Sequence, residues 1–228
     1  REALGHFLQA LDFIRRIELG REEPKCLYNV GYAYLTLAEA KAAGQYLDES
    51  LALASRQGNR IIQALCCNSL AELALERGQA ATALGLNSRA LRFGMEMDHS
   101  AISIEAYTGL GMAHEQDGSL EAALANYKLA VGLIEDIRNN LRFREYSTGF
   151  FKDRINVYEK LIDLNARLNE KNPGRGYDGE CFYYAEKART RAFLDDMQAA
   201  EVKPQTDGVA RALQYEIDIL SHRVSKII

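Results

Sequence analysis

The chain has 228 residues, of which 47% are hydrophobic and 26% charged, with a net charge of -4, 3 prolines and no tryptophan. This composition supports a continuous apolar core and excludes disordered and collagen-like chains. No apolar run approaches the roughly 18 residues that span a bilayer, and no leader pattern opens the chain. Because Arg1 already lies inside an amphipathic pattern, we expect the sequence to be a piece of a longer protein.

The charge distribution bears on the kind of partner, and the cysteine spacing bears on the cellular compartment. Residues 1–137 carry 12 Lys and Arg against 18 Asp and Glu, and residues 138–228 carry 16 against 14. Neither part has the dense basic face that phosphate binding needs, so we expect no nucleic-acid partner and no membrane partner. The four cysteines, at 26, 66, 67 and 181, show no disulfide-framework or metal-binding spacing. We therefore expect a reducing compartment, the cytoplasm.

A pattern of small and large residues recurs with a constant 40-residue period along residues 1–137. Its small positions are Gly31, Ala71 and Gly111, each followed later in the same copy by alanine at Ala43, Ala83 and Ala123. Counting back one further period places Ala3, Phe7 and Ala10 in phase with the second part of a copy. Such a period is the mark of a tandem-repeat architecture.

Within each copy, apolar residues follow helical spacing in two blocks. The blocks break near Gly20, Gly58, Gly78 and Gly118, and helix-start signals stand at Asn59, Asp98 and Ser119. Each copy is therefore predicted to be an antiparallel helical hairpin, in which the small residues let the two backbones approach closely. Large residues such as Leu27, Tyr34, Leu47, Tyr107 and Tyr127 would then fill the space between hairpins. The predicted fold class is all-α, a right-handed α-α superhelix.

These positions resemble the tetratricopeptide repeat. The third copy matches its pattern best, with Tyr107, Leu110, Gly111, Ala123, Tyr127 and Ala130. His114 replaces the usual tyrosine, and there we expect an interior histidine with its hydrogen bonds satisfied. The resemblance covers the chain from residue 1 to about residue 137, with repeats longer than the common length of about 34 residues. It implies a solenoid that binds other proteins.

A second resemblance concerns the C-terminal part. The period breaks after Asn140 and an enlarged repeat follows from about residue 141, with a polar loop at residues 169–178. The segment Tyr184–Arg189 resembles the last repeat of bacterial proteins in which such repeats precede a caspase-like CHAT peptidase domain. This resemblance implies the regulatory region of a larger peptidase.

The domain prediction is a helical repeat domain over residues 1–200, then a linker and an amphipathic helix over residues 201–228. Pro204 stops the preceding helix. The last helix carries a heptad seam of Leu213, Ile217, Leu220, Val224 and Ile227. That seam either mediates self-association or folds back on the preceding hairpin.

No constellation for catalysis is evident, and we predict that the chain is not an enzyme and holds no cofactor or metal. Cys66 and Cys67 are adjacent on a helix, so their side chains diverge by about 100 degrees and do not converge on one metal. Cys67 and Cys181 fall at structural repeat positions. The sequence Pro173–Gly176 lacks the ending of a phosphate loop and is predicted to be a turn.

The predicted functional surface is the concave face. The tetratricopeptide resemblance places positions 2, 5, 9 and 12 of each first helix there, and these residues are Lys25, Tyr28, Tyr32, Leu35, Leu65, Asn68, Glu72, Leu75, Glu105, Thr108, Met112 and Glu115. Aromatic, apolar and acidic groups suit an extended peptide or helix that carries apolar and basic residues. The alternatives are a face that packs against another part of the same protein, or a purely architectural module that links domains or copies.

The same resemblance argues against one ligand class. Tetratricopeptide domains that grip acidic chaperone tails use lysine and asparagine at inward positions. Here those positions hold Tyr28, Tyr32, Ser69, Glu105 and Gly109. The predicted ligand is therefore basic or apolar-basic.

Overall fold

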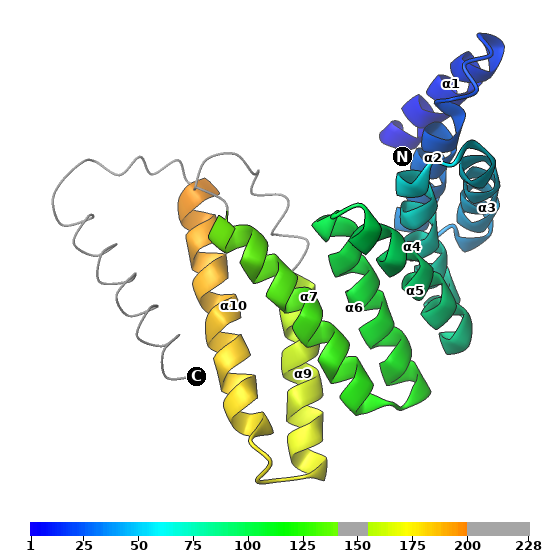
Figure 1. Cartoon of the computed structure of the whole chain (residues 1–228). Coiled ribbons are helices and arrows are strands. Elements are labelled where there is room, and N and C mark those ends of the chain that lie inside the picture. The colour runs from blue at the N-terminus through cyan, green and yellow to red at the C-terminus, as the bar shows by residue number, and fades with distance from the viewer. Residues whose placement is uncertain (141–154, 200–228) are drawn as a thin grey trace, which may run out of the picture.

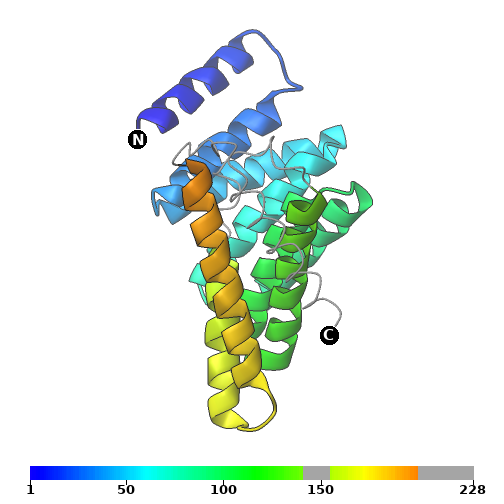
Figure 2. The same cartoon turned by 90° about the vertical axis from the view of Figure 1, so that its left-hand side faces the viewer.

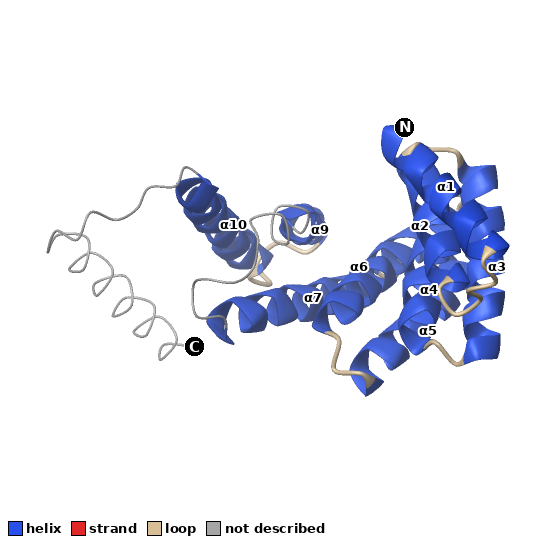
Figure 3. Cartoon of the chain, turned by 90° about the horizontal axis from the view of Figure 1, so that it is seen from above, coloured by secondary structure: helices blue, strands red, loops and turns tan. Residues whose placement is uncertain are grey.

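The structure, a computed structural model, describes residues 1–140 and 155–199, with side chains described for residues 1–137 and 156–190. All secondary structure in these ranges is helical, as Figures 1 and 3 show. The helices are α1 (Glu2–Arg16), α2 (Glu23–Thr36), α3 (Ala40–Gln57), α4 (Arg60–Glu76), α5 (Ala80–Glu96), α6 (Ser100–Asp117), α7 (Leu120–Asn140), α9 (Ile155–Lys171) and α10 (Tyr177–Ala199).

Consecutive helices pair as hairpins, α2 with α3, α4 with α5, α6 with α7 and α9 with α10. Each second helix also packs against the first helix of the next hairpin, so that α3 contacts α4, α5 contacts α6 and α7 contacts α9. The hairpins follow one another from α1 at one end to α10 at the other (Figure 1), and Figure 2 shows the same stack from the side on which α10 lies. This arrangement confirms the predicted all-helical superhelix.

The first helices form a continuous inner row. Helix α2 contacts α4 and α4 contacts α6, in addition to their own hairpin partners. Helix α1 has only α2 beside it as a major neighbour within the described chain. That the sequence opens on the second helix of a hairpin stays a prediction.

The turns between helices are evenly spaced. Within residues 1–140, left-handed backbone conformations occur at Glu18, Ala38, Gly58, Gly78, Asp98 and Gly118. Glycine adopts this conformation without steric cost, whereas the other residue types are strained in it. Each helix together with its turn therefore occupies a 20-residue unit, and two units make the 40-residue repeat.

Two local predictions are tested at the helix starts. Asn59 is the N-cap of α4, and its side chain accepts a hydrogen bond from the Ile62 backbone N–H at 3.2 Å, as predicted. The helix start predicted at Asp98 is wrong by one residue, because Asp98 takes the left-handed conformation with φ 51°. The N-cap of α6 is His99, whose Nδ1 accepts from the Ile102 N–H at 3.4 Å.

Small residues sit where the two helices of a hairpin cross. A Cβ atom added at Gly31 would lie 2.8 Å from Cγ of Leu47, closer than real contacts allow. A Cβ at Gly111 would overlap the ring of Tyr127, which is completely buried. The facing alanines, Ala43, Ala83 and Ala123, are also 0% exposed. The predicted close approach of the paired backbones is confirmed.

The largest apolar cluster joins the third hairpin to the fourth. It runs from Tyr127 and Ile134 of α7 to Leu161, Leu164 and Leu168 of α9. The loop between α9 and α10 is shorter than the polar loop predicted at residues 169–178, because helix continues to Lys171 and resumes at Tyr177. The predicted terminal helix, with its seam from Leu213 to Ile227, lies outside the described residues.

The four cysteines are free thiols. Cys66 and Cys67 are 0% exposed, and the Cys66 Sγ donates to the Ser50 Oγ at 3.2 Å. Burial raises the pKa of Cys66 to about 12 and raises that of Cys67. Cys26 and Cys181 are only partly buried. The complete burial of Cys67 confirms the packing role predicted for it, whereas Cys181, for which the same role was predicted, is only partly buried, with its Sγ 3.6 Å from the Ile162 carbonyl.

His114 differs from its prediction. Its side chain is partly buried, and its Nδ1 has no hydrogen-bond partner among the described residues. The expectation of an interior histidine with every hydrogen bond satisfied is therefore wrong.

The close approach at Gly111 predicts an overpacking penalty. Replacing Gly111 with Ala should lower the free energy of unfolding by about 1 to 3 kcal/mol, because the new methyl group would press on the Tyr127 ring. Replacing Gly132 in α7 is the matched control, since nothing lies within 4 Å of a Cβ there. Gly132→Ala should raise the same free energy by roughly 0.5 to 1 kcal/mol. Urea unfolding followed by circular dichroism measures both free energies. If Gly111→Ala leaves the free energy of unfolding unchanged, the close contact between Gly111 and the Tyr127 ring is wrong.

The burial of the vicinal cysteines predicts selective alkylation. In native protein at pH 8, iodoacetamide should modify Cys26 and Cys181 about a hundredfold faster than Cys66 and Cys67, because the reagent reaches only accessible thiols and Cys66 and Cys67 are 0% exposed. Burial raises the pKa of Cys26 as well as those of Cys66 and Cys67, so the contrast depends on accessibility. Peptide mass spectrometry gives the four rates. In urea all four thiols should react at similar rates, and equal rates in the native protein would refute the buried placement.

Candidate functional site: the inner helix row

The predicted partner-binding residues lie along α2, α4 and α6, the inner row, and differ in how much surface they offer. Those exposed are Lys25, Tyr32, Glu72 and Glu105, and those partly buried are Tyr28, Leu65, Asn68, Leu75, Thr108, Met112 and Glu115. Leu35 is 7% exposed and packs in a core cluster with Ala43, Leu47 and Leu73. Leu35 therefore offers almost no surface to a partner.

An aromatic pair marks the N-terminal part of the inner row. The rings of Tyr28 and Tyr32 stack with centroids 5.9 Å apart and an interplanar angle of 24°. Tyr32 is 47% exposed, whereas Tyr28 is partly buried and packs against apolar clusters that contain Leu73 and Cys66 of α4. Burial raises the pKa of Tyr28, and the negative charge of Glu105 on α6 raises it further. Groups from all three inner helices thus meet around Tyr28.

Asn68 links α4 to α6. Its Nδ2 donates to the Ile102 carbonyl at 3.3 Å and to the Glu105 carboxylate at 3.4 Å. Its Oδ1 is buried and accepts no hydrogen bond from the described residues. A buried amide oxygen without a donor is costly, so this acceptor is chemically unsatisfied in the described chain.

Glu72 lies one turn along α4 from Asn68. Partial burial raises the pKa of its carboxyl group, and repulsion from Glu76 and Glu105 raises it further. Within the described residues, no ion pair joins Glu72 or Glu76 to a cation.

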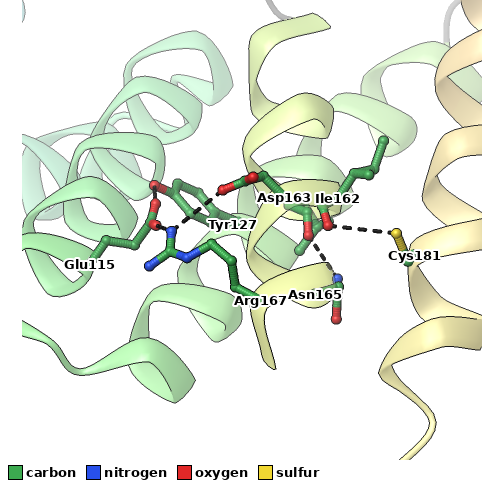
Figure 4. A network of polar contacts seen from close by, with 8 residues as sticks. Glu115, Tyr127, Ile162, Asp163, Asn165, Arg167 and Cys181 are labelled. Carbon is green, nitrogen blue, oxygen red and sulfur yellow. Dashed lines mark hydrogen bonds and ion pairs between the residues drawn. The ribbon is translucent and has the colours of Figure 1, made fainter. Parts of the chain in front are cut away.

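Glu115, the last predicted residue, is bound within the fold (Figure 4). One carboxylate oxygen accepts from the Tyr127 hydroxyl at 2.5 Å, and the other pairs with Arg167 of α9 at 2.5 Å. Arg167 also lies 3.4 Å from Asp163. Burial and the Glu115 charge raise the pKa of Tyr127. Sequence reasoning missed Arg167 because it lies beyond the regular 40-residue period.

The remaining predicted residues contribute to contacts within and between the inner helices. Met112 packs against the large cluster shared by α6, α7 and α9, and the Thr108 hydroxyl donates to the Ile104 carbonyl at 2.8 Å. The Leu75 carbonyl accepts from Gln116 Nε2 at 3.0 Å, which ties α4 to α6. The hydrogen bond made by Gln116 carried no sequence signal, because glutamine has no assigned place in the repeat pattern.

In the described part of the chain, no three or more histidine, cysteine, aspartate or glutamate side chains are placed to hold a metal ion. Nor does any helix there combine the length and the apolar character needed to cross a membrane. The chemistry of the inner row is therefore argued from its aromatic, amide and carboxylate groups.

Comparison with known families identifies the repeats. The family model described as Tetratricopeptide repeat matches residues 24–57 and 104–137, which contain the α2–α3 hairpin and most of the α6–α7 hairpin. No curated protein matches the chain. The first and third complete copies are thus recognised, while the second copy, with Cys67, Ala74 and Asn87 at pattern positions, is not.

Several solved structures share the fold at low sequence identity. BtubC from P. vanneervenii is 16% identical with a TM-score of 0.61, over 91% of this chain and 80% of BtubC. A Rap protein complexed with Competence and Sporulation Factor is 14% identical with a TM-score of 0.64, over 84% of this chain. Apo RapI is 14% identical with a TM-score of 0.61, over 96% of this chain.

The chain spans 50% of that Rap protein and 58% of RapI. At these identities the likeness concerns the fold alone. With the matches at residues 24–57 and 104–137, it establishes that the chain is an all-helical α-α superhelix of tetratricopeptide-like hairpins.

Proposed function

We propose that this chain is a protein-protein interaction module that binds an extended peptide, or a helix of a partner protein, along the inner row. The observation that carries the proposal is the combination of aromatic, amide and carboxylate groups that the inner row presents. The exposed ring of Tyr32, the partly buried amide of Asn68 and the exposed carboxylate of Glu72 all belong to helices of the inner row. A polypeptide supplies apolar surface, backbone donors and cations in one ligand.

A structural relative supports the proposal by analogy. The similar Rap protein was solved in complex with Competence and Sporulation Factor. A superhelix of this general architecture therefore holds a ligand in at least one protein. For the present chain, the chemistry of its own inner row decides which ligand fits.

We also propose a wider context for the module, the regulatory region of a larger CHAT-type peptidase in the cytoplasm. The sequence of α10 from Tyr184 to Arg189 supports it, together with the four free thiols. The reading frame downstream of Ile228 tests it, since a caspase-like domain encoded there is expected. A different downstream domain would overturn the peptidase context and leave the interaction module intact.

The competing proposal is a purely architectural module that joins domains or copies. Its candidate surface, the seam of Leu213, Ile217, Leu220, Val224 and Ile227, lies outside the described residues. Sedimentation of the chain with Leu220→Asp and Val224→Asp tests this alternative. A loss of oligomer mass would favour association through the seam.

The inner-row proposal predicts where a partner touches the chain. A photoreactive benzoylphenylalanine that replaces Tyr32 should form adducts with a partner. The same group in place of Ser88, on α5 outside the inner row, should form none. Both positions are exposed, so they differ only in the face of the superhelix on which they lie. Mass spectrometry identifies the adduct. With the identified partner in purified form, Tyr32→Ala should weaken binding by about tenfold, roughly 1.4 kcal/mol.

Ser88→Ala is the control and should leave the affinity unchanged. Adducts formed only from Ser88, or equal affinity of the Tyr32→Ala and Ser88→Ala proteins, would place the binding surface elsewhere.

A further inference from the structure

We infer that the contact between α5 and α6 fixes the order of the hairpins, so that the second hairpin stacks on the third and not on another copy of the first or the second. The contact, which we call the α5–α6 joint, consists of Asn87 and Gly94 on α5 with Ser103 and Gly109 on α6. It concerns how the superhelix assembles, and it does not depend on the proposed binding of a partner.

The α5–α6 joint is a pair of reciprocal contacts, in which each helix offers a glycine to a polar side chain of the other. A Cβ atom added at Gly109 would lie 2.6 Å from Asn87 Oδ1, and one added at Gly94 would lie 2.6 Å from Ser103 Oγ. Real Cβ atoms do not approach other atoms so closely. Asn87 is 1% exposed and Ser103 is 5% exposed. Any side chain on either glycine would therefore displace a buried polar group of the neighbouring helix.

The close glycine contacts of the first and third hairpins have a different place. Gly31 faces Leu47 and Gly111 faces Tyr127, so each contact joins the two helices of one hairpin. In the second hairpin, the repeat position of Leu47 and Tyr127 is taken by Asn87, whose amide lies against a glycine of the next hairpin. The second hairpin therefore uses this position to select its neighbour.

The repeat period shows why Asn87 suits α6 alone among α2, α4 and α6. The residues one and two periods before Gly109 are Ser69 in α4 and Asn29 in α2. Both carry a side chain where the α5–α6 joint requires none. Asn87 would overlap that side chain if α5 were stacked on α2 or on α4 in the same geometry. The glycine of α6 is thus the feature that admits Asn87.

The second contact of the joint is equally selective. The counterparts of Gly94 are Ala54 in α3 and Ile134 in α7, so among these helices Ser103 finds its glycine on α5 alone. At the preceding junction the same repeat positions make another contact, since Gln63 Nε2 of α4 donates to the Ala54 carbonyl at 3.3 Å. Successive junctions therefore carry different chemistry at equivalent positions, which discriminates between hairpins of otherwise similar shape.

Asn87 is costly to the fold, which supports a role in selectivity. Its Nδ2 is buried and has no hydrogen-bond acceptor within the described residues. A buried donor without an acceptor destabilises the folded state, whereas an apolar side chain avoids that penalty. Buried polar groups retained at such a cost are best attested as determinants of register and partner choice. Tandem repeats need a determinant of this kind because similar hairpins compete for the same neighbour, within one chain or between copies.

The first test follows refolding of the intact 228-residue chain. Asn87→Leu gives α5 the residue that α3 has at Leu47, and so removes the selectivity while filling the core. After unfolding in urea and refolding at high protein concentration, this variant should contain about tenfold more dimer formed by exchanged hairpins than the unaltered chain. Size-exclusion chromatography with light scattering measures the dimer, and each protein before unfolding gives the baseline. The free energy of unfolding should be equal or higher, which a loss of packing alone does not produce.

Gly85→Ala is the matched control for refolding. Gly85 also lies on α5, and nothing lies within 4 Å of a Cβ there. This variant should refold with the dimer content of the unaltered chain. An Asn87→Leu protein that refolds with no more dimer than Gly85→Ala would overturn the inference.

A double-mutant cycle tests the α5–α6 joint independently, even if Asn87→Leu does not fold. Gly109→Ala should raise the equilibrium constant of unfolding by at least about fivefold in the unaltered chain, because the added methyl group presses on Asn87. The same change should have little effect when Asn87→Ala is already present. Additive effects of the two changes would show that the contact is absent and would overturn the inference. Neither contrary result would touch the proposed interaction function.

Discussion

The superhelix depends on the close crossing of two helices in each hairpin. At the third hairpin, the absence of a side chain on Gly111 lets the Tyr127 ring lie directly against the α6 backbone. The first hairpin repeats the arrangement with Gly31 and Leu47. Because a large residue on one helix fills the space that a small residue leaves on the other, the two helices can approach each other closely. Successive hairpins can then stack with the same geometry.

That constraint also determines which residues remain for binding. The side chains at the small and large repeat positions of each helix are buried in the core. The other side chains of the inner row remain accessible to a partner. Tyr32, Glu72 and Lys25 are exposed for this reason, while Leu35 is buried in the core cluster that its own hairpin shares with Leu73 of the next. Charged groups near the fourth hairpin have a different role, since Arg167 and Glu115 tie α9 to α6.

Periodicity was sufficient to predict the fold. Gly31, Ala71 and Gly111 are equally spaced along the chain, and that spacing predicted hairpins, their pairing and the small residues at the crossings. The residues of the inner row were predicted one by one, but the degree to which each of their side chains is buried was not. Nothing in the local sequence distinguishes Leu35, which packs with Leu73 of the next hairpin, from an exposed leucine. Long-range contacts such as Glu115 with Arg167 break the period and left no local signal.

The residues with left-handed backbone conformation are evenly spaced over the first 140 positions, so this part of the superhelix is built from units of equal length. If one whole 40-residue repeat is duplicated or deleted, every turn, helix crossing and inner position keeps its place relative to its neighbours. An insertion or deletion of any other length would shift one helix along its partner. The length of the inner row can therefore change over evolution while the chemistry of each inner helix is preserved. Tandem duplication then becomes a route to recognising a longer segment of a partner, with the contacts made by the existing helices kept intact.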